Sequence, residues 1–164
     1  MDGGLVGRAR AGDADAFDEL ARSRIDQVYR TALAILGSPA DARDATQEAL
    51  VSMWRGLPSL RSEAAFDGWL HQITVNACKM SLRRRRGVRE VDLTELQSDS
   101  HIRSDSTFNQ AFDRLNVDQR ALLVAHHLDG LSVAELAVQL RIPEGTVKSR
   151  LFNARAALDK ALKS

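Results

Sequence analysis

Residues 131–158, with the sequence LSVAELAVQLRIPEGTVKSRLFNARAAL, constrain the fold most, because their pattern predicts two short amphipathic helices. Ser132 followed by Glu135 is a capping-box pattern, which places the start of a helix at this point. Pro143 ends that helix, since proline disfavours a helical conformation in the preceding residue, and it can itself open the next helix. Two helices joined by a turn of about three residues predict a helix-turn-helix.

The outward face of the second of these helices carries side chains that suit DNA. The apolar residues recur at helical spacing and are expected to face inward; they are Val147, Leu151, Ala154 and Leu158. The opposite face carries cations, a hydroxyl, an amide and an aromatic ring, which suit base edges and phosphates. These residues are Lys148, Ser149, Phe152, Asn153 and Arg155. Any amphipathic helical hairpin also has a polar outer face, so this pattern alone leaves both interpretations open.

The distribution of charge favours contact with a polyanion. The formal net charge is only +1, yet residues 59–89 carry seven Lys and Arg against two Asp and Glu, and residues 141–164 carry six against two. The first block contains the run Arg83–Arg86, and the second coincides with the predicted outward face. Two separated basic blocks indicate two contacts on one polyanion.

Composition limits the class of protein. The 164 residues allow one domain or two small ones, and 44% hydrophobic residues are enough for packed cores. No apolar run approaches the ~18 residues of a membrane span, and residues 1–17 lack the hydrophobic core of a secretion signal, so we expect a cytoplasmic location. The single cysteine, Cys78, permits no internal disulfide and is expected to be buried and inert.

Helical periodicity runs almost throughout the chain and predicts an all-α fold. We expect a first long helix from Phe17 to Gly37, with Ile25 in its apolar stripe, and a second from Ser38-Pro39 to about Leu57, with Trp54 in its stripe. A short loop over 59–65 precedes a third helix, which runs from Phe66 into the arginine run. Two further helices are expected before the helix-turn-helix.

The pattern dissolves into Asp, Ser and isolated aliphatic residues between 87 and 106, which predicts a flexible linker. The expected organisation is therefore two small helical domains, over residues 1–86 and 107–164, on a flexible tether.

Three groups of residues, in matching order and spacing, resemble the motifs of one bacterial family. They lie at 41–55 (DARD, QE and MWR), at 66–83 (FDGWL through LR) and at 128–151 (LDGLS, ELA and GTVKSRL). The family is that of the RNA polymerase sigma factors of the extracytoplasmic-function (ECF) group within the sigma-70 family. The resemblance runs from about Phe17 to Leu162 apart from the tether, and it implies sigma region 2 in the first domain and sigma region 4 in the second.

The first motif places an acidic face on a helix. Asp41, Asp44 and Glu48 fall at positions i, i+3 and i+7, so they share one face with Gln47 beside them, opposite the inward stripe. The resemblance implies that this face docks on the clamp helices of the largest subunit of core RNA polymerase, and that the flap of the second-largest subunit is also a partner. Alternatively, Asp41 and Asp44 only complement the helix dipole after Ser38, and both roles can coexist.

The resemblance assigns the second motif to the minus-ten promoter element. It implies that the loop 59–65 supplies a pocket for a base turned out of the duplex, with support from the adjoining helix face. The residues expected to contact this element are Ser59, Leu60, Arg61, Ser62, Asn76, Lys79, Arg83, Arg84, Arg85 and Arg86. The arginine run would bind phosphates, although a solvated charge run at a helix end is an alternative interpretation.

The resemblance assigns the third motif to the minus-thirty-five element. Lys148 suits guanine acceptors and Phe152 suits thymine methyl groups, while the arginines suit the DNA backbone, with Arg150 alternatively forming an ion pair inside the fold. The expected contacts are Arg141, Thr146, Lys148, Ser149, Arg150, Phe152, Asn153 and Arg155.

No catalytic constellation or cofactor site is expected. The adjacent His126 and His127 point about 100° apart on a helix and cannot share a metal ion, and the chain has no phosphate-binding glycine loop. We therefore expect a sigma factor that binds core polymerase and promoter DNA, helps to melt the promoter, does not insert into a membrane and is controlled by an anti-sigma factor. The alternatives are a stand-alone helix-turn-helix regulator and, less favoured, an enzyme acting on nucleic acid.

Overall fold

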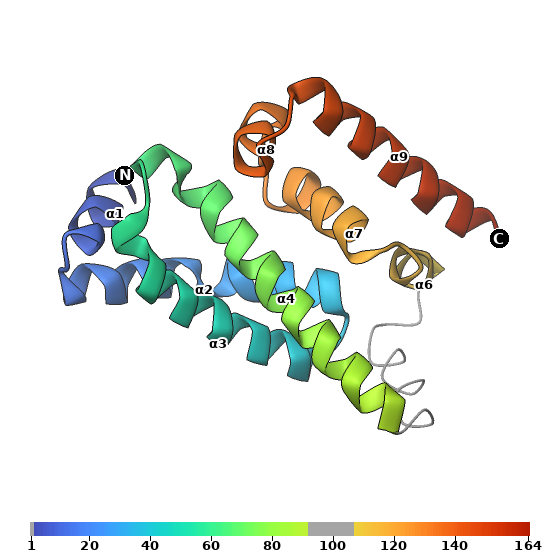
Figure 1. Cartoon of the computed structure of the whole chain (residues 1–164), viewed down its shortest axis with the longest axis horizontal. Coiled ribbons are helices and arrows are strands. Elements are labelled where there is room, and N and C mark those ends of the chain that lie inside the picture. Colours follow the sequence, from blue (N-terminus) through green and yellow to red (C-terminus); the bar gives the residue numbers. More distant parts are fainter. Residues whose placement is uncertain (1, 92–106) are drawn as a thin grey trace.

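The computed structural model describes residues 2–91 and 107–164, and every regular element in these two ranges is a helix (Figure 1). This confirms the predicted all-α fold class. The N-terminal half, residues 2–91, contains α1 (Asp2–Arg10), α2 (Ala14–Leu36), α3 (Pro39–Gly56), the short 3-10 turns η1 (Leu57–Ser59) and η2 (Glu63–Ala65), and α4 (Phe66–Val91). The C-terminal half, residues 107–164, contains α6 (Thr107–Asp113), α7 (Val117–Leu123), the π-helical turn η3 (Val124–Leu128), α8 (Val133–Leu140) and α9 (Glu144–Lys163).

In the N-terminal half, α2, α3 and α4 pack against one another. The sequence sets the joint between α2 and α3 as predicted, because Gly37 adopts a left-handed conformation (φ 77°) and Pro39 begins α3. The Ser38 side chain caps α3 by accepting a hydrogen bond from the Asp41 backbone N–H at 3.3 Å. This joint turns α3 back along α2, so that Leu20, Ile35 and Met53 meet in one core.

Helix α1 was not predicted from the sequence. Its glycines lower helix propensity, but Leu5, Val6 and Ala9 are buried against α2, and this packing outweighs the local preference. Arg10 at its end donates a hydrogen bond from Nη2 to the Leu60 carbonyl at 2.7 Å. Helix α1 therefore holds the 59–65 segment in place.

In the C-terminal half, α8 and α9 form the predicted helix-turn-helix. Both bonds of the capping box are present: the Glu135 N–H donates to Ser132 Oγ at 3.0 Å, and the Ser132 N–H donates to Glu135 Oε1 at 3.1 Å. Arg141 ends α8 in a left-handed conformation (φ 58°), and Pro143 occupies the cap position before α9 rather than its first turn.

The predicted helix preceding Gly130 is interrupted. After α7, the residues 124–128 form a π turn, in which the Asp129 N–H bonds the Val124 carbonyl at 2.9 Å. This wider turn directs Asp129 toward the N-terminal half.

The two halves pack directly against each other, which the sequence did not predict. Helix α4 contacts α8, and α2 contacts both η3 and α7. Figure 1 shows the C-terminal half lying alongside the N-terminal bundle. Buried apolar residues of both halves form a single connected cluster. Helix α4 reaches Val91, past the expected domain end at residue 86, and the rest of the expected linker, 92–106, lies outside the described residues.

Some residues of the expected apolar stripes are exposed instead, Ile25 and Trp54 among them. Ile25 is 42% exposed because it lies five residues after Leu20, about 140° around the helix from that buried position. Trp54 is 55% exposed and packs edge-on against Phe17, with ring centroids 4.8 Å apart. In the described parts of the chain, no helix is both long enough and apolar enough to cross a membrane.

This packing predicts a large difference between two aliphatic truncations in the same helix. Leu20→Ala removes a fully buried side chain and is expected to lower the free energy of unfolding by about 2–5 kcal/mol. Ile25→Ala, in the same helix, is expected to change it by less than about 1 kcal/mol. Urea unfolding followed by circular dichroism measures both values, and equal losses would contradict the placement of α2.

Candidate nucleic-acid interface

The outer face of α9 is the predicted minus-thirty-five surface. Val147, Leu151 and Ala154 are buried, as predicted for the inward stripe, whereas its fourth member, Leu158, is half-buried. Phe152 lies four residues after Lys148 and so shares its face, and its ring is 71% exposed. Of the predicted contact residues, Thr146 is half-buried, and the exposed ones are Arg141, Lys148, Ser149, Arg150, Phe152, Asn153 and Arg155. The predicted contact residues other than Thr146 are therefore accessible on the surface of α9.

The two adjacent histidines lie beside this helix. His126 Nδ1 lies 2.8 Å from the Leu131 carbonyl, and Arg155 Nε donates to His127 Nε2 at 3.3 Å. Desolvation lowers the pKa of His127, and the charges of Arg155 and His126 lower it further, so His127 accepts this bond as a neutral ring. Within residues 2–91 and 107–164, no three His, Cys, Asp or Glu side chains are grouped so that they could hold a metal ion.

The acidic face of α3 and the arginine run of α4 contact each other. Arg84 Nη2 lies 3.2 Å from Glu48 Oε1, and Arg85 forms a close ion pair with Asp41. Residues predicted to face polymerase therefore pair with residues predicted to bind phosphates. Sequence reasoning treated the two sets as separate surfaces, because the packing of α3 on α4 cannot be read from either motif.

Three further members of these sets are accessible. Asp44 and Gln47 are exposed on α3, opposite the buried stripe, as predicted, and Arg83 is exposed on α4. The structure describes the backbone of Arg86 but not its side chain.

The 59–65 segment is more ordered than the predicted loop, since η1 and η2 occupy most of it. Ser59, Arg61 and Ser62 are exposed, but Leu60 is buried. Its side chain packs in the core while its carbonyl accepts the bond from Arg10. This burial argues against the expected contact between the Leu60 side chain and a base, and gives Leu60 the role of anchoring the segment.

Asn76 and Lys79 differ in their contacts. Asn76 is exposed and accepts a hydrogen bond from Gln72 Nε2 at 3.1 Å. Lys79 Nζ forms an ion pair with Asp118 Oδ1 at 2.7 Å, so a predicted minus-ten residue is bound to the half that carries the minus-thirty-five surface.

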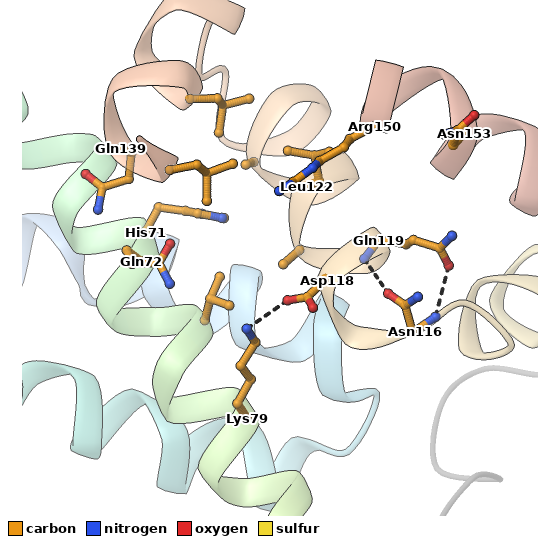
Figure 2. A pocket seen from close by; sticks show the side chains of 15 residues that line it. His71, Gln72, Lys79, Asn116, Asp118, Gln119, Leu122, Gln139, Arg150 and Asn153 are labelled. Atoms are coloured by element: carbon orange, nitrogen blue, oxygen red, sulfur yellow. Dashed lines mark hydrogen bonds and ion pairs between the residues drawn. The ribbon is translucent and has the colours of Figure 1, made fainter. Parts of the chain in front are cut away.

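A cleft of about 490 Å³ lies between the two halves (Figure 2). Helix α4 contributes Gln72 and Lys79 to one wall, and α9 contributes Arg150 and Asn153 to the other. Arg150 is exposed in this cleft, in contrast to the alternative expectation of an ion pair inside the fold. Predicted contacts for both promoter elements therefore line one narrow space.

Sequence reasoning missed the groups that join the halves. The sequence motifs predicted no role for four residues that form polar contacts across the interface between the halves. These residues are Asp118, Asp129, Thr31 and His71. Thr31 and Asp129 are 98 positions apart and His71 and Asp129 are 58 apart, so no local pattern connects them.

A second, more apolar groove of about 940 Å³ lies on another side of the junction. Leu33 from α2, Phe108 and Phe112 from α6, and Leu158 from α9 line it, and Phe108 stacks on Phe112 with centroids 5.8 Å apart. Arg30 and Arg155 add positive charge to its lining.

Comparison with known families assigns both halves. The model of Sigma-70 region 2 matches residues 20–88, and the model of Sigma-70 region 4 matches residues 107–158. The ECF RNA polymerase sigma factor SigM of Mycobacterium tuberculosis is 39% identical over 165 residues, with 98% of this chain and 84% of SigM covered. The chain belongs to the ECF group of the sigma-70 family.

Other relatives of this sigma factor agree in sequence and in fold. The ECF RNA polymerase sigma-E factor of Escherichia coli is 32% identical over 174 residues, covering 94% of this chain and 91% of the relative. CnrH, solved in complex with the cytosolic domain of CnrY, superposes with a TM-score of 0.74 at 25% identity, covering 99% of this chain and 97% of CnrH. The sigma factor RpoE of Bartonella quintana, solved with the anti-sigma factor NepR, shares the fold with a TM-score of 0.70 at 24% identity, over 90% of this chain and 96% of RpoE.

Cys78 of the sigma factor lies on the buried side of α4, beside Lys79. It is fully buried, as predicted. Burial raises the pKa of the Cys78 thiol from 9.0 to about 12, and the nearby charge of Arg120 opposes this shift only in part. The thiol is therefore protonated at physiological pH and inert as a nucleophile.

This predicts slow alkylation of the native protein. At pH 8, iodoacetamide is expected to modify Cys78 about a hundredfold or more slowly in the folded protein than in guanidinium chloride, because the thiolate is the reacting form and is scarce in the fold. The folded protein should react faster only as the pH rises toward 12. Mass spectrometry of quenched samples gives both rates, and comparable rates would show that Cys78 is not buried.

Proposed function

We propose that this sigma factor binds core RNA polymerase, directs it to promoters through the minus-ten and minus-thirty-five elements, and assists promoter melting in the cytoplasm. Sigma factors are non-catalytic initiation factors, so the polymerisation chemistry belongs to the polymerase. The observation that carries the proposal is the exposed cationic and aromatic face of α9 on a chain that also matches Sigma-70 region 2 over residues 20–88.

For the minus-thirty-five element, α9 would enter the major groove. Lys148 would bond guanine acceptors, Phe152 would contact thymine methyl groups and Asn153 would suit adenine. Arg141, Arg150 and Arg155 would contact phosphates, which fix the register of the helix but specify no sequence.

For the minus-ten element, the exposed residues of the 59–65 segment would hold the flipped base. Its polar members are Ser59, Arg61 and Ser62, and Asn76 and Lys79 extend the surface along α4. Extruding a base costs a few kcal/mol of lost stacking and pairing, which these contacts would offset. Arg83 and Arg84 would bind the flanking phosphates.

Core polymerase would dock on the acidic face of α3 through its clamp helices, with the flap of the second-largest subunit as a further contact. Asp44 and Gln47 are exposed and ready for this contact. Asp41 and Glu48 would first exchange their internal arginine partners for cations of the polymerase, which would free Arg84 and Arg85 for DNA. Such an exchange keeps each charge paired and so avoids the free-energy cost of leaving a charge without a partner.

A promoter library tests this function against a stand-alone helix-turn-helix regulator. The purified chain is added to core polymerase that lacks any other specificity subunit, and transcripts are sequenced. New transcripts from a shared pair of elements are expected, whereas DNA binding without transcripts would favour the stand-alone regulator. Asp44→Lys should abolish both core binding and transcripts because it reverses an exposed charge of the docking face. Asp26→Lys, an equivalent reversal on the exposed side of α2, is the control and should leave both unchanged.

Two further variants separate the selection of a promoter sequence from the general affinity for DNA. Lys148→Ala is expected to reduce discrimination between cognate and scrambled duplexes by about 1–3 kcal/mol. The double variant Arg83→Gln and Arg84→Gln should weaken binding to both duplexes alike and reduce the salt dependence by about two units of slope, because each arginine releases condensed counterions. Titrations of the complex with core polymerase, in which Arg84 is free of Glu48, measure both effects at several salt concentrations. Equal losses of discrimination would refute this division of roles.

An inhibitory protein is a further expected partner, as complexes of CnrH and RpoE with partner proteins support. The apolar groove between α2, α6 and α9 would receive an amphipathic segment with acidic residues near Arg30 and Arg155. Recovery of polymerase but no dedicated inhibitor in a pull-down from the native cells would count against it.

A further inference from the structure

The polar residues proposed to hold the flipped base lie beside one buried residue, Leu60. Ser59 and Arg61 are exposed on either side of it, whereas the Leu60 side chain is only 6% exposed and packs in the core. The backbone at Leu60 is extended (φ −62°, ψ 128°), and successive side chains of an extended segment point to opposite sides. Burial of Leu60 therefore directs Arg61 outward.

Arg10 of α1 holds the carbonyl of the same residue. Its Nη2 donates to the Leu60 carbonyl oxygen at 2.7 Å, across 50 positions of sequence. A peptide unit is planar, so a fixed Leu60 carbonyl also fixes the amide and the Cα of Arg61. Arg10 is half-buried, and a hydrogen bond is stronger where water is partly excluded.

We propose that Arg10 is a positioning residue for recognition of the minus-ten element: it contacts no base itself, and it sets the orientation in which Arg61 and Ser62 meet DNA. This inference rests on the proposed function of the 59–65 segment. Helix α1 precedes residues 20–88, which match Sigma-70 region 2, so Arg10 lies outside the part of the chain that this match covers.

Helix α1 is anchored well enough to give this support. Val6 and Ala9 are buried, and α1 packs along α2. Gly12 adopts a left-handed conformation (φ 101°) where the chain turns from α1 into α2. Gly7 of α1 lies directly against the Glu63 carboxylate, so a side chain at residue 7 would displace it. The 59–65 segment therefore rests on α1 at more than one point.

Other contacts hold the two ends of the segment. Before it, Gly56 at the end of α3 lies against Trp69 of α4, where a Cβ would stand 2.9 Å from the indole Cζ2. After it, the Arg24 guanidinium of α2 lies over the Phe66 ring, 5.5 Å from the centroid. Because the ends are held independently, loss of the Arg10 bond is expected to change the middle of the segment without unfolding the bundle.

Loss of this bond should reduce the choice of base more than the affinity for DNA. Without the Arg10 donor, the partly buried Leu60 carbonyl lacks its partner, which favours rotation of the peptide toward water. Arg61 and Ser62 then sample several orientations, and hydrogen bonds weaken steeply as their angles depart from linearity. The correct base loses most, because it makes the full set of bonds, whereas phosphate contacts continue to supply general affinity.

Matched arginine variants test this role in the complex with core polymerase. The probe is fork-junction DNA with a duplex minus-thirty-five element and a single-stranded minus-ten element, both taken from the promoter library. Arg10→Met removes the donor but keeps an aliphatic stem, whereas Arg8→Met changes an exposed arginine of the same helix. Arg10→Met is expected to lower the preference for the cognate minus-ten bases over single-base substitutions by about tenfold, because a charge-assisted hydrogen bond is lost. Arg8→Met should leave this preference unchanged, and Arg10→Lys, which keeps a charged donor, should retain most of it.

The salt dependence of binding distinguishes positioning from a direct phosphate contact. A cation that neutralises one phosphate contributes about one unit to the slope of log affinity against log salt concentration. Arg10→Met is expected to keep the slope of the unmodified chain. A slope lower by about one unit, with an unchanged preference for the cognate bases, would show that Arg10 binds DNA directly and would refute the positioning role.

Amide hydrogen exchange in the free chain tests the positioning without DNA or polymerase. The Leu60 N–H donates to the Leu57 carbonyl at 3.1 Å, so its exchange reports local opening of the segment. Arg10→Met should speed this exchange by about tenfold relative to the unmodified chain and to Arg8→Met, while amides of α3 stay protected.

The two readouts separate a failure of this inference from a failure of the proposed function. Equal exchange in all three chains, an unchanged base preference in Arg10→Met, or a preference in Arg10→Lys no better than in Arg10→Met would overturn the positioning role. Absence of transcripts from the unmodified chain would instead refute the proposed function, and the exchange rates would still decide whether Arg10 orders the segment.

Discussion

Helix α4 packs against elements of both halves, and the remaining arrangement depends on this packing. One side of α4 completes the bundle with α2 and α3, and another side contacts α8 of the helix-turn-helix. Because both contacts belong to one helix, Lys79 on this helix faces α7 and lines the cleft with residues of α9. The ion pairs of Arg84 and Arg85 also link α4 to the acidic face of α3. Helix α4 therefore contacts or carries residues from all three predicted surfaces: the polymerase-binding, minus-ten and minus-thirty-five surfaces.

Local chemistry explains why much of the fold could be predicted from the sequence. The capping box of Ser132 and Glu135, the glycine at 37 and the proline at 39 each act within a few residues, so their effects do not depend on the rest of the chain. The same holds for the exposed face of α9, since helical spacing alone places Lys148 and Phe152 on one side. These elements were predicted with the correct type and nearly the correct bounds.

Contacts between distant residues explain what the sequence could not predict. The pairing of Thr31 with Asp129 joins residues 98 positions apart, and the pairing of Arg85 with Asp41 joins two motifs whose roles were predicted separately. Helix α1 forms against its local propensity because α2 supplies an apolar surface. Tertiary packing also decides the position of Leu60. Its place in the motif predicted a contact with the minus-ten element, but its side chain is buried in the core.

The position of Asp129 depends on the number of residues in the π turn at 124–128. A π turn contains one more residue than an α turn, and loss of that residue rotates the following backbone by about 100°. The carboxylate would then swing away from α2 although every side chain were retained. A single-codon insertion or deletion could therefore change the contact between the halves of this sigma factor without altering any residue that is predicted to touch DNA.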